Sequence, residues 1–419
     1  MPLPLVRAAW LVLAIGLAGC ARHAPRADAP AIATTAPATL LLVSLDGMRA
    51  DYLQRGITPN LDRMMREGAS AQWLTPSYPS LTFPNHYTLV TGLRPDHHGI
   101  INNTMRDQAL GGFTASDTRA VGDARWWQGE PIWVGAERAG LRTATMFWPG
   151  SEAAVNGVRP TAWSSYDKSL SMEARVERVI GWLDLPASQR PRLITLYLEH
   201  VDTAGHDHGP DSPEVDAAIG AVDAAIGRLR AHVRQHARAV PVNLVVVSDH
   251  GMAATSIDRT IAVESLLAPD DAEVIAPGQV VGFRPRAGRE AIVEQRLLAP
   301  HDHLQCWRKQ DMPVRWQYGR HPRIPPFVCQ AEEGWLLVHQ SYIDRRRASG
   351  WSGGGAHGYD PALPSMRAIF LAQGPAFRSG ARIPAFDNVD VYPLLAHLLG
   401  ITPAPNDGDA TTLEPLLAR

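Results

Sequence analysis

The amino-acid sequence predicts an α/β fold in which a mostly parallel central sheet is flanked by helices. Short, continuous apolar runs are typical of strands buried on both faces of a sheet. These runs alternate along the chain with segments of helical periodicity, which is the pattern of βα units. Several runs end directly in Asp or His, as expected where parallel strands deliver polar side chains to one edge. A chain of 419 residues can carry this fold as one domain with insertions, which we place at residues 39–412.

The composition is that of a globular protein, and it excludes some kinds of chemistry. Hydrophobic residues make up 45% and charged residues 20% of the chain. The formal net charge of −2 gives no electrostatic support for a nucleic-acid partner, and no nucleic-acid-binding surface is evident. Of the 40 basic residues only Lys168 and Lys309 are lysines, so a Schiff base or a phosphate loop of the Gly-Lys-Ser/Thr type has almost no candidate residue.

Residues 1–19 have the composition of an export signal. Arg7 precedes the apolar run 8–17, which is too short to span a membrane. The ending Leu17-Ala18-Gly19-Cys20 resembles a bacterial lipobox, which implies that the signal is removed and that Cys20 receives lipid. The alternative is a short apolar leader that ends in a cysteine by chance. Ala21 follows the cysteine, which by analogy favours the outer membrane.

The segment 20–38 is expected to be a disordered tether. It is rich in Ala, Pro and Thr, so it buries too little apolar surface to fold. With the lipidated leader it predicts export to the periplasm or cell envelope, where contact with the membrane is made through a lipid anchor only.

The elements of the domain follow in the order that the fold class requires. The expected strands are continuously apolar and lie at 39–45, 144–147, 193–198, 243–247 and 366–371. The expected helices have apolar residues at helical spacing or a proline in the first turn, and several stop at a glycine; they lie at 59–67, 84–90, 213–233 and 389–399. The segment 92–100 is expected to form a turn, and its adjacent His97 and His98 are interpreted as hydrogen-bonded scaffold rather than metal ligands.

Residues 255–347 are expected to form a small α+β insertion on the main sheet, because the alternating pattern weakens there. A strand is predicted at 280–283, a helix at 289–298 and a strand at 335–339. The insertion contains Cys306 and Cys329, whose separation suits one local disulfide in an oxidising compartment. A metal site made from only these two cysteines is the weaker alternative.

Side chains with metal-ligand chemistry follow three of the predicted strands. Asp46 follows the first strand, Asp202 and His206 follow 193–198, and Asp249 and His250 follow 243–247. Asp202 and His206 are four residues apart, so on a helical turn both side chains point the same way, as a shared metal requires. Carboxylates also cap helices at such positions, but the whole set at one sheet edge indicates a site.

Thr82 is the expected reactive group. It directly precedes the helix at 84–90, whose N-terminus concentrates unsatisfied N–H groups and positive potential where a phosphate can bind. His357 lies on the glycine-rich segment 353–360, which is expected to be a flexible loop whose backbone approaches a ligand closely.

Oxygen and nitrogen ligands without sulfur fit two zinc-like ions rather than one. Two such ions hold the attacking and leaving oxygens of an in-line phosphoryl displacement, and coordination lowers the pKa of a threonine hydroxyl. We therefore expect Thr82 to form a covalent phospho-enzyme intermediate that a metal-bound water releases, and Asn103 to stabilise the developing charge. The expected metal ligands are Asp46, Thr82, Asp202, His206, Asp249, His250 and His357.

The sequence resembles the nucleotide pyrophosphatase/phosphodiesterases of the alkaline phosphatase superfamily, in a bacterial form. The resemblance runs from about Thr39 to Leu399 and is weakest in the insertion. It rests on six motifs: Ser44-Leu45-Asp46-Gly47, Leu81-Thr82-Phe83-Pro84-Asn85-His86, Phe147-Trp148-Pro149-Gly150-Ser151-Glu152, Asp202-Thr203-Ala204-Gly205-His206, Ser248-Asp249-His250-Gly251-Met252 and His357-Gly358-Tyr359-Asp360.

This resemblance implies an alkaline-phosphatase-like three-layer fold and a specific use of the site residues. Asp46, Thr82, Asp249 and His250 would hold one zinc ion, and Asp202, His206 and His357 would hold the other. Thr82 would be the nucleophile and Asn103 the oxyanion donor. A nucleobase would lie between Phe83 and Tyr166, and Trp148, Glu152 and Tyr197 would line the surroundings of that slot. The alternative is that Tyr166 and Tyr197 are core tyrosines and that Trp148 caps the core.

The sequence thus predicts a zinc-dependent enzyme that hydrolyses nucleotide phosphodiester and pyrophosphate bonds and releases nucleoside 5′-monophosphates. Two enzymatic alternatives share the fold: a phosphomonoesterase, which usually needs further positive charge, and a choline-phospholipid phosphodiesterase, which needs an acidic or aromatic cage. A third alternative is a lipid-tethered protein that binds metal or nucleotide without catalysis, but such a protein has no need of Thr82 beside the ligands.

Overall fold

The computed structural model describes residues 38–418, and the expected signal, tether and lipidation site at Cys20 lie outside the described residues. Its largest sheet has eight strands in the order β19-β2-β18-β9-β1-β8-β6-β7. The strands are Ala381–Ile383 (β19), Ala69–Ala71 (β2), Phe370–Gln373 (β18), Val242–Val247 (β9), Thr39–Leu45 (β1), Leu193–Leu198 (β8), Thr143–Met146 (β6) and Ala162–Ser164 (β7).

The centre of this sheet is parallel, as the sequence predicts. β1 pairs in parallel with β8 on one side and β9 on the other, and β6 pairs in parallel with β8 and β7. β18 is antiparallel to β9 and β2, so one strand interrupts the parallel order. The mostly parallel α/β arrangement is therefore confirmed.

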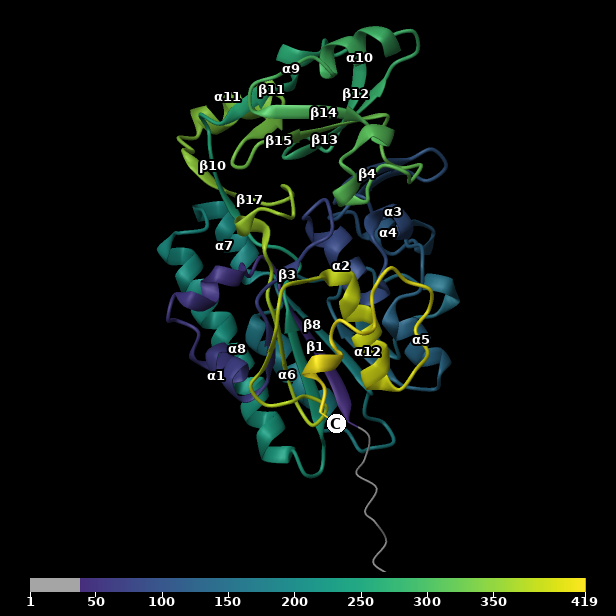
Figure 1. Cartoon of the computed structure of the whole chain (residues 1–419), viewed down its shortest axis with the longest axis vertical. Coiled ribbons are helices and arrows are strands. Elements are labelled where there is room, and N and C mark those ends of the chain that lie inside the picture. Colours follow the sequence, from purple (N-terminus) through teal and green to yellow (C-terminus); the bar gives the residue numbers. More distant parts are fainter. Residues whose placement is uncertain (1–37, 419) are drawn as a thin grey trace, which may run out of the picture. The chain divides into compact units, whose positions relative to one another are not determined.

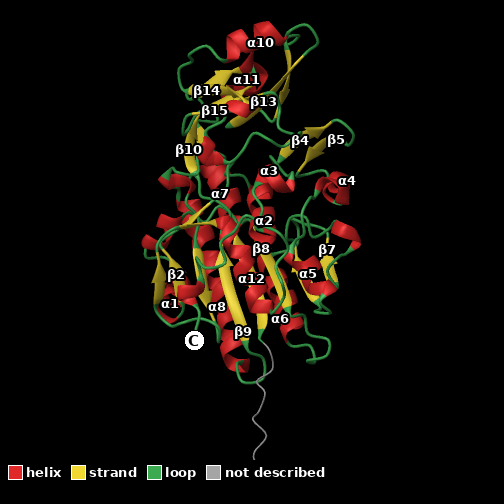
Figure 2. Ribbon diagram, turned by 45° about the vertical axis from the view of Figure 1, so that its right-hand side comes forward, coloured by secondary structure: helices red, strands yellow, loops and turns green. Residues whose placement is uncertain are grey.

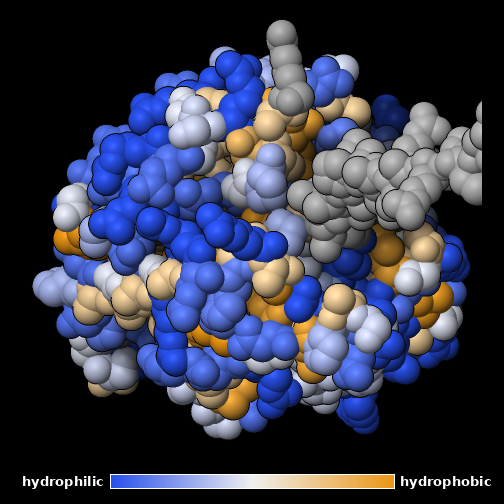
Figure 3. Space-filling model, turned by 90° about the horizontal axis from the view of Figure 1, so that it is seen from below, coloured by the Kyte–Doolittle hydropathy of each residue, from blue (hydrophilic) through white to orange (hydrophobic). Residues whose placement is uncertain are grey.

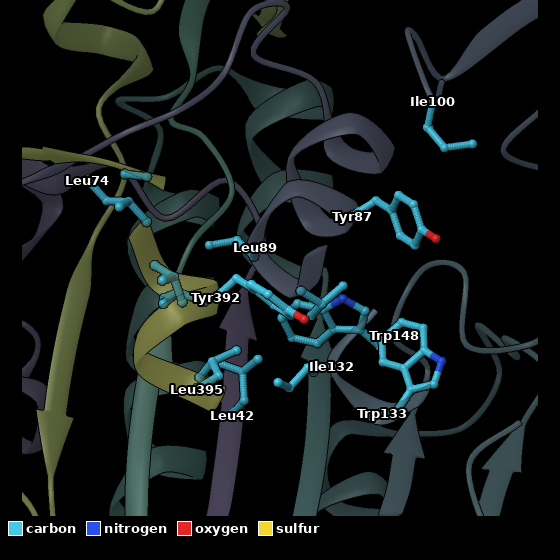
Figure 4. Close-up of a cluster of buried hydrophobic side chains, with 14 of the residues drawn as sticks. Leu42, Leu74, Tyr87, Leu89, Ile100, Ile132, Trp133, Trp148, Tyr392 and Leu395 are labelled. Atoms are coloured by element: carbon cyan, nitrogen blue, oxygen red, sulfur yellow. The ribbon is translucent and has the colours of Figure 1, made fainter. Parts of the chain in front are cut away.

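Helices cover both faces of the sheet (Figures 1 and 2). On one face lie Pro59–Glu67 (α1), Met172–Leu183 (α6) and Pro213–His236 (α8), and on the other lie Thr82–Thr91 (α2), Ile132–Arg138 (α5) and Val391–Leu399 (α12). Alternate residues of β1 serve the two cores: Leu40 and Leu42 belong to the cluster under α2 and α12, and Leu41 and Val43 to the cluster under α1 and α8. Figure 4 shows Tyr87, Leu89, Ile132, Trp133, Tyr392 and Leu395 gathered over Leu42.

The insertion is a separate small layer beyond the carboxyl ends of the central strands (Figure 1). It has a four-stranded antiparallel sheet and its own hydrophobic core. Its strands are Ala272–Ile275 (β12), Val280–Pro285 (β13), Leu304–Arg308 (β14) and Phe327–Ala331 (β15), its helices are Val263–Leu266 (α9), Glu290–Leu297 (α10) and Gln340–Ala348 (α11), and Thr260–Ala262 (β11) pairs with Leu336–Val338 (β16). A disulfide joins Cys306 of β14 to Cys329 of β15.

Two buried charged residues attach the insertion to the main domain. The guanidinium of Arg323 donates to the backbone oxygens of Gly99 and Trp126, at 2.8 and 2.6 Å. The carboxylate of Asp96 accepts from the backbone N–H groups of Gly319, Arg320 and His321. These bonds hold the insertion beside the segment that follows α2.

Three segments differ from the expectation. Residues 353–360 are not simply a loop, because Gly353–Ala356 (β17) pairs antiparallel with Ala253–Ser256 (β10). Within the expected turn 92–100, Pro95–His98 (α3) forms one helical turn. The packed chain also continues beyond residue 412, since Leu413 and Leu416 are buried in the main core.

Seen from below the view of Figure 1, the surface is largely hydrophilic, with hydrophobic residues scattered among the polar ones (Figure 3). None of the helices within residues 38–418 combines the length and the apolar character that crossing a membrane requires.

Candidate active site

The predicted site residues meet at the carboxyl ends of the central strands. Asp46 follows β1, and Asp249 and His250 follow β9. His200–His208 (α7), directly after β8, carries Asp202 and His206. Thr82 is the first residue of α2, and His357 follows β17. All of these except Asp202 and His206, which are partly exposed, are buried.

Asp202, His206 and His357 form one cluster in which acceptor atoms face one another. The Nε2 atoms of the two histidines are 3.0 Å apart, and each lies 3.4 Å from Oδ1 of Asp202. Nδ1 of His206 is 2.9 Å from the Gly355 oxygen, and Nδ1 of His357 is 2.9 Å from the Ser80 oxygen. A carbonyl oxygen can only accept, so both protons sit on Nδ1 and both Nε2 lone pairs point at each other. A cation between them fits this arrangement.

Asp46, Asp249 and His250 form an adjoining cluster around the hydroxyl of Thr82. His250 Nε2 lies 2.8 Å from Oδ2 of Asp249, 3.4 Å from Oδ1 of Asp46 and 3.2 Å from Oγ1 of Thr82. Its Nδ1 is 2.9 Å from the Gly251 oxygen, so this histidine also presents a bare Nε2 in its neutral form.

The carboxylates of the two clusters carry buried oxygens that no protein group satisfies. Oδ1 of Asp46 and Oδ1 of Asp202 have no hydrogen-bond partner among the described residues, and Oδ2 of Asp249 has only the imidazoles of His250 and His86 beside it, at 2.8 and 3.3 Å. Burying a carboxylate without a partner costs free energy on the order of several kcal/mol, as for other buried ions. Imidazole nitrogens and carboxylate oxygens are ligands that suit zinc and related divalent ions, so the residues present fit a binuclear metal centre.

Electrostatics in the absence of metal point the same way. Burial, and next the charges of Asp249 and Asp202, raise the pKa of Asp46 well above its ordinary value. Burial opposes ionisation of Asp249, but His250 and His86 outweigh it and hold the pKa of Asp249 well below its usual range. Burial also lowers the pKa of His357 well below that of a free imidazole, which keeps its ligand nitrogen unprotonated. Positive charge is needed to hold these carboxylates together.

The N-terminus of α2 shapes the approach to Thr82. Asn103 accepts the backbone N–H of Phe83 at 2.9 Å through its Oδ1. This bond turns the donor end of the Asn103 amide away from Phe83, and both residues line the cavity beside Thr82. A phosphoryl oxygen placed there meets an amide donor and the positive end of the helix.

The cavity beside Thr82 is large and partly aromatic. Its volume is about 840 Å³, and its lining includes Phe83, Phe147, Glu152, Tyr166 and Tyr197. Tyr166 is 40% exposed and packs edge-on against Phe147, with ring centroids 5.4 Å apart. Glu152 accepts the Tyr166 backbone N–H at 2.8 Å, so it orients the segment that carries this tyrosine. The space suits a planar group held against aromatic rings.

Trp148 does not line this cavity. It is 1% exposed, its Nε1 donates to the His86 backbone oxygen at 3.1 Å, and it lies in the core shown in Figure 4. Phe147, in the left-handed backbone region with φ of 65°, occupies the cavity wall instead. Because of this left-handed conformation just after β6, Phe147 rather than Trp148 faces the cavity. The alternation of side chains along a strand does not predict this.

Tyr197 reaches the site through its hydroxyl as well as its ring. The hydroxyl donates to Oδ2 of Asp46 at 2.5 Å, and the ring packs edge-on against His86 and Tyr166. The side chain is 9% exposed. Tyr197 therefore orients a carboxylate of the metal-binding cluster in addition to lining the cavity.

Other supporting residues carry little signal in the sequence. His86 ends the Leu81–His86 motif; its Nδ1 is 2.9 Å from the Thr82 backbone oxygen and its Nε2 is 2.8 Å from Ser44 Oγ. The bond to Thr82 lies within α2, and the bond to Ser44 holds α2 against β1. Lys168 also lines the cavity, and so does a wall built from Ala115, Ser116, Thr118 and Val121, where the sequence pattern is weak.

Comparison with known proteins gives consistent matches. The family model described as type I phosphodiesterase / nucleotide pyrophosphatase matches residues 40–360. An uncharacterised pyrophosphatase/phosphodiesterase of Schizosaccharomyces pombe is 38% identical over 90% of this chain and 80% of its own length. Ectonucleotide pyrophosphatase/phosphodiesterase family member 3 of Bos taurus is 37% identical over 90% of this chain, which spans only 44% of that relative. A venom phosphodiesterase of Crotalus durissus collilineatus is 38% identical, and 46% of it is covered.

Solved structures agree with these sequence matches. Murine ectonucleotide pyrophosphatase/phosphodiesterase 5, an inactive variant in complex with AMP, has a TM-score of 0.85 and 35% identity, over 91% of this chain and 100% of that one. The human protein of the same name also has a TM-score of 0.85, with 36% identity over the same shares. The fold is thus alkaline-phosphatase-like α/β, and the chain belongs to the type I phosphodiesterase / nucleotide pyrophosphatase family.

Proposed function

We propose that this protein hydrolyses phosphodiester and pyrophosphate bonds of nucleotides and releases nucleoside 5′-monophosphates, with Thr82 as the nucleophile. The observation that carries the proposal is the position of the Thr82 hydroxyl. It lies at the N-terminus of α2, 3.2 Å from Nε2 of His250, and at the wall of the aromatic cavity. Family membership supports the same class of reaction.

The proposed metal ligands fall into two sets. Zinc fits a donor set made of imidazole, carboxylate and hydroxyl groups. When bound, two such ions would lower the pKa of the Thr82 hydroxyl and of a water molecule and would offset phosphoryl charge. We assign Asp46, Thr82, Asp249 and His250 to one ion and Asp202, His206 and His357 to the other. The second set coincides with a cluster whose ligand atoms all lie within 4.8 Å of one another.

The chain's own groups account for the two chemical steps. Oγ1 of Thr82 gives up its proton to solvent and attacks phosphorus; the new O–P bond forms as the bond to the leaving group breaks, and the leaving oxygen keeps the electron pair. Water then attacks the same phosphorus, the Thr82 O–P bond breaks, and the hydroxyl is restored. The amide N–H group of Asn103 donates to a non-bridging oxygen in both steps.

Phe83 and Tyr166 are proposed to hold the nucleobase. Both line the cavity, and Tyr166 remains partly exposed as a stacking surface must. Stacking tolerates any base because every base has a π face. Glu152 and Tyr197 would act indirectly, by orienting Tyr166 and Asp46. A murine relative with the same fold has been solved in complex with AMP, which is a nucleoside 5′-monophosphate.

Replacement of Thr82 tests the nucleophile. We expect Thr82→Ala to lower kcat for a nitrophenyl ester of thymidine 5′-monophosphate by at least roughly 10³-fold. Thr82→Ser keeps a hydroxyl and is the matched control, which should retain measurable turnover. Acid quench of the wild type during turnover should trap a nucleotidyl group on Thr82, detectable by peptide mass spectrometry. Near-normal activity of Thr82→Ala would exclude this role.

A substrate panel tests the substrate class. Zinc-loaded protein should prefer the nucleotide diester over nitrophenyl phosphate and over nitrophenyl phosphorylcholine, and a chelator should abolish activity that zinc restores. Lys168 in the cavity wall is the positive group that a monoesterase would use, so Lys168→Met should reduce monoester turnover only if that alternative holds. A preference for the choline ester would favour the phospholipid alternative.

We further propose that the chain is exported in a bacterial cell and anchored by lipid at Cys20. The proposal rests on the leader and on Leu17-Ala18-Gly19-Cys20. Metabolic labelling with a fatty acid should mark the wild type and not Cys20→Ala, and fractionation should place the wild type in the outer membrane. A Cys20→Ala protein that still fractionates with membranes would contradict the anchor.

A further inference from the structure

Away from the active site, residues 38–418 contain one further group of side chains with metal-ligand chemistry. Asp184, His232 and His236 each offer a ligand atom, and these atoms all lie within 4.8 Å of one another. Asp184 caps the carboxyl end of α6, and the two histidines lie in the last turns of α8. α6 and α8 pack against each other on one face of the sheet (Figures 1 and 2).

The two histidines share one face of α8. They are four residues apart, and their ring centroids are 4.4 Å apart. Nδ1 of His236 donates to the His232 backbone oxygen at 3.0 Å, because a carbonyl oxygen can only accept. This bond fixes the tautomer of His236 and leaves its Nε2 lone pair without a proton. It is the arrangement that a metal-ligating histidine uses.

Asp184 supplies the third ligand from a different helix. Its Oδ1 lies 2.8 Å from Nε2 of His232. A tetrahedral zinc ion with bonds of about 2.0–2.1 Å separates its ligand atoms by about 3.3 Å, so only a small movement admits an ion. The side chain of Asp184 is 51% exposed and has room to make it. A hydrogen-bonded pair alone would need only His232 and Asp184, and it leaves unexplained why a ring nitrogen of His236 lies within 4.8 Å of the ligand atoms of both.

The local electrostatics favour a cation. The carboxyl ends of both α6 and α8 converge there, and each carries partial negative charge. Two neighbouring arginines are already paired: Arg228 with Glu177, and Arg190 with the Leu183 backbone oxygen at 2.7 Å; Arg234, in the last turn of α8, adds one positive charge nearby. Two imidazoles, one carboxylate and no sulfur suit Zn²⁺, Cu²⁺ or Ni²⁺ rather than Ca²⁺ or Mg²⁺. The exposed side of Asp184 lets water complete the coordination.

We propose that Asp184, His232 and His236 form a second metal site, separate from the active site, which binds a divalent transition-metal ion of the zinc class. The ion joins the end of α6 to the end of α8. The segments that follow these helices lead into β8 and β9, the strands that deliver Asp202 and Asp249 to the active site. The site is structural, and it does not depend on the proposed reaction.

Metal stoichiometry tests this site. Full-length protein is saturated with Zn²⁺, freed of excess by gel filtration and analysed for bound zinc. We expect His236→Gln and Asp184→Asn each to hold one equivalent less than the wild type. His303→Gln is the matched control: His303 also pairs with a carboxylate, Glu332 at 2.8 Å, but it has no third ligand within the described residues. It should keep the wild-type zinc content.

Thermal stability and activity complete the test. Added Zn²⁺ should raise the Tm of the wild type further than that of His236→Gln, while kcat for the nucleotide ester stays equal in both, which shows that the variant is folded and that its active site is intact. Equal zinc content and equal Tm shifts in the wild type, His236→Gln and His303→Gln would overturn the proposal. Failure of the proposed catalytic function would leave this comparison unchanged.

Discussion

Three histidines of the active site share one hydrogen-bonding arrangement. In His206, His250 and His357, Nδ1 donates to a backbone oxygen, of Gly355, Gly251 and Ser80 respectively, and Nε2 faces the cluster. The backbone thereby selects the tautomer and aims the lone pair before any ion arrives. The spacing of these histidines in the sequence predicts that they belong to the site. For His206 and His357, the partner of Nδ1 is supplied by a distant segment, whereas His250 uses the residue that follows it.

Tyr197 provides a prediction at the residue scale. Its hydroxyl donates to Oδ2 of Asp46, and burial, followed by the negative charge of Asp46 and Asp202, raises the pKa of Tyr197 well above its ordinary value, so the proton stays on the tyrosine. Tyr197→Phe removes this donor and leaves the ring. We expect zinc affinity, measured by competition with a chromophoric chelator, to fall about 10- to 100-fold.

The matched control for this prediction is Tyr166→Phe. Tyr166 also lines the cavity and packs against Tyr197, but its hydroxyl makes no bond to Asp46. Its zinc affinity should equal that of the wild type. If Tyr197→Phe also binds zinc as tightly as the wild type, Asp46 is oriented by other groups.

At the scale of elements, β17 shows why glycines follow one another before His357. A Cβ on Gly354 would lie 2.3 Å from the His206 backbone oxygen, and one on Gly355 would lie 2.4 Å from that of Gly205. The strand therefore needs glycine to pass close to α7. This contact also delivers the Gly355 oxygen to His206, so the glycines serve packing of a strand against a helix rather than loop flexibility.

The junction between α2 and α3 gives a prediction for acid stability. His98 is fully buried; its Nδ1 accepts the Ile100 N–H at 3.1 Å and its Nε2 bonds Thr88 Oγ1 at 3.0 Å. Burial lowers the pKa of His98 to about 3. Below about pH 6.5 this histidine is protonated in the unfolded chain but stays neutral in the folded chain. The free energy of unfolding therefore decreases as the pH is lowered, down to about pH 3. Between pH 8 and pH 5 this loss is about 2 kcal/mol.

Urea unfolding of the wild type and of His98→Gln at the two pH values measures this effect. The variant has a lower stability at pH 8, because it disturbs the buried bonds, but it should lose about 2 kcal/mol less than the wild type on acidification. The same substitution at exposed His397 is the control and should preserve the wild-type pH dependence. Parallel losses in the wild type and His98→Gln would show that His98 does not set the acid limit.

At the scale of the whole molecule, the insertion supports the active site from outside. The ring of Trp316 stacks on Tyr78 with centroids 4.0 Å apart, and its Nε1 donates to Asp360 at 3.1 Å. Tyr78 precedes the Thr82 segment, and Asp360 follows His357. Trp316 of the insertion thus contacts both the segment that leads to Thr82 and the segment that follows His357.

Trp316→Ala should therefore reduce activity as well as stability. We expect kcat for the nucleotide ester to fall about 10- to 100-fold through misplacement of Thr82 and His357, and the free energy of unfolding to fall by about 3–5 kcal/mol. Trp316→Phe retains an aromatic ring against Tyr78 and should keep most of the activity. Normal kcat in a folded Trp316→Ala protein would show that the insertion does not position these segments.

The sequence by itself determined the central strands and the identity of the residues that meet at their ends. Continuous apolar runs at β1, β8 and β9 specify buried parallel strands, and whatever follows such strands must gather at one edge, so Asp46, Asp202 and Asp249 were predictable as neighbours. Local periodicity and the chemistry of strand ends are properties of short segments, so they can be recognised in the sequence alone.

Tertiary structure alone decided contacts between segments that are distant in the chain. It placed Phe147 rather than Trp148 at the cavity and joined Tyr197 to Asp46 by a hydrogen bond. It also paired β17 with β10 and brought Asp184 next to His232, which is 48 residues away. Such contacts depend on backbone reversal and on the docking of whole elements, and no local periodicity encodes them.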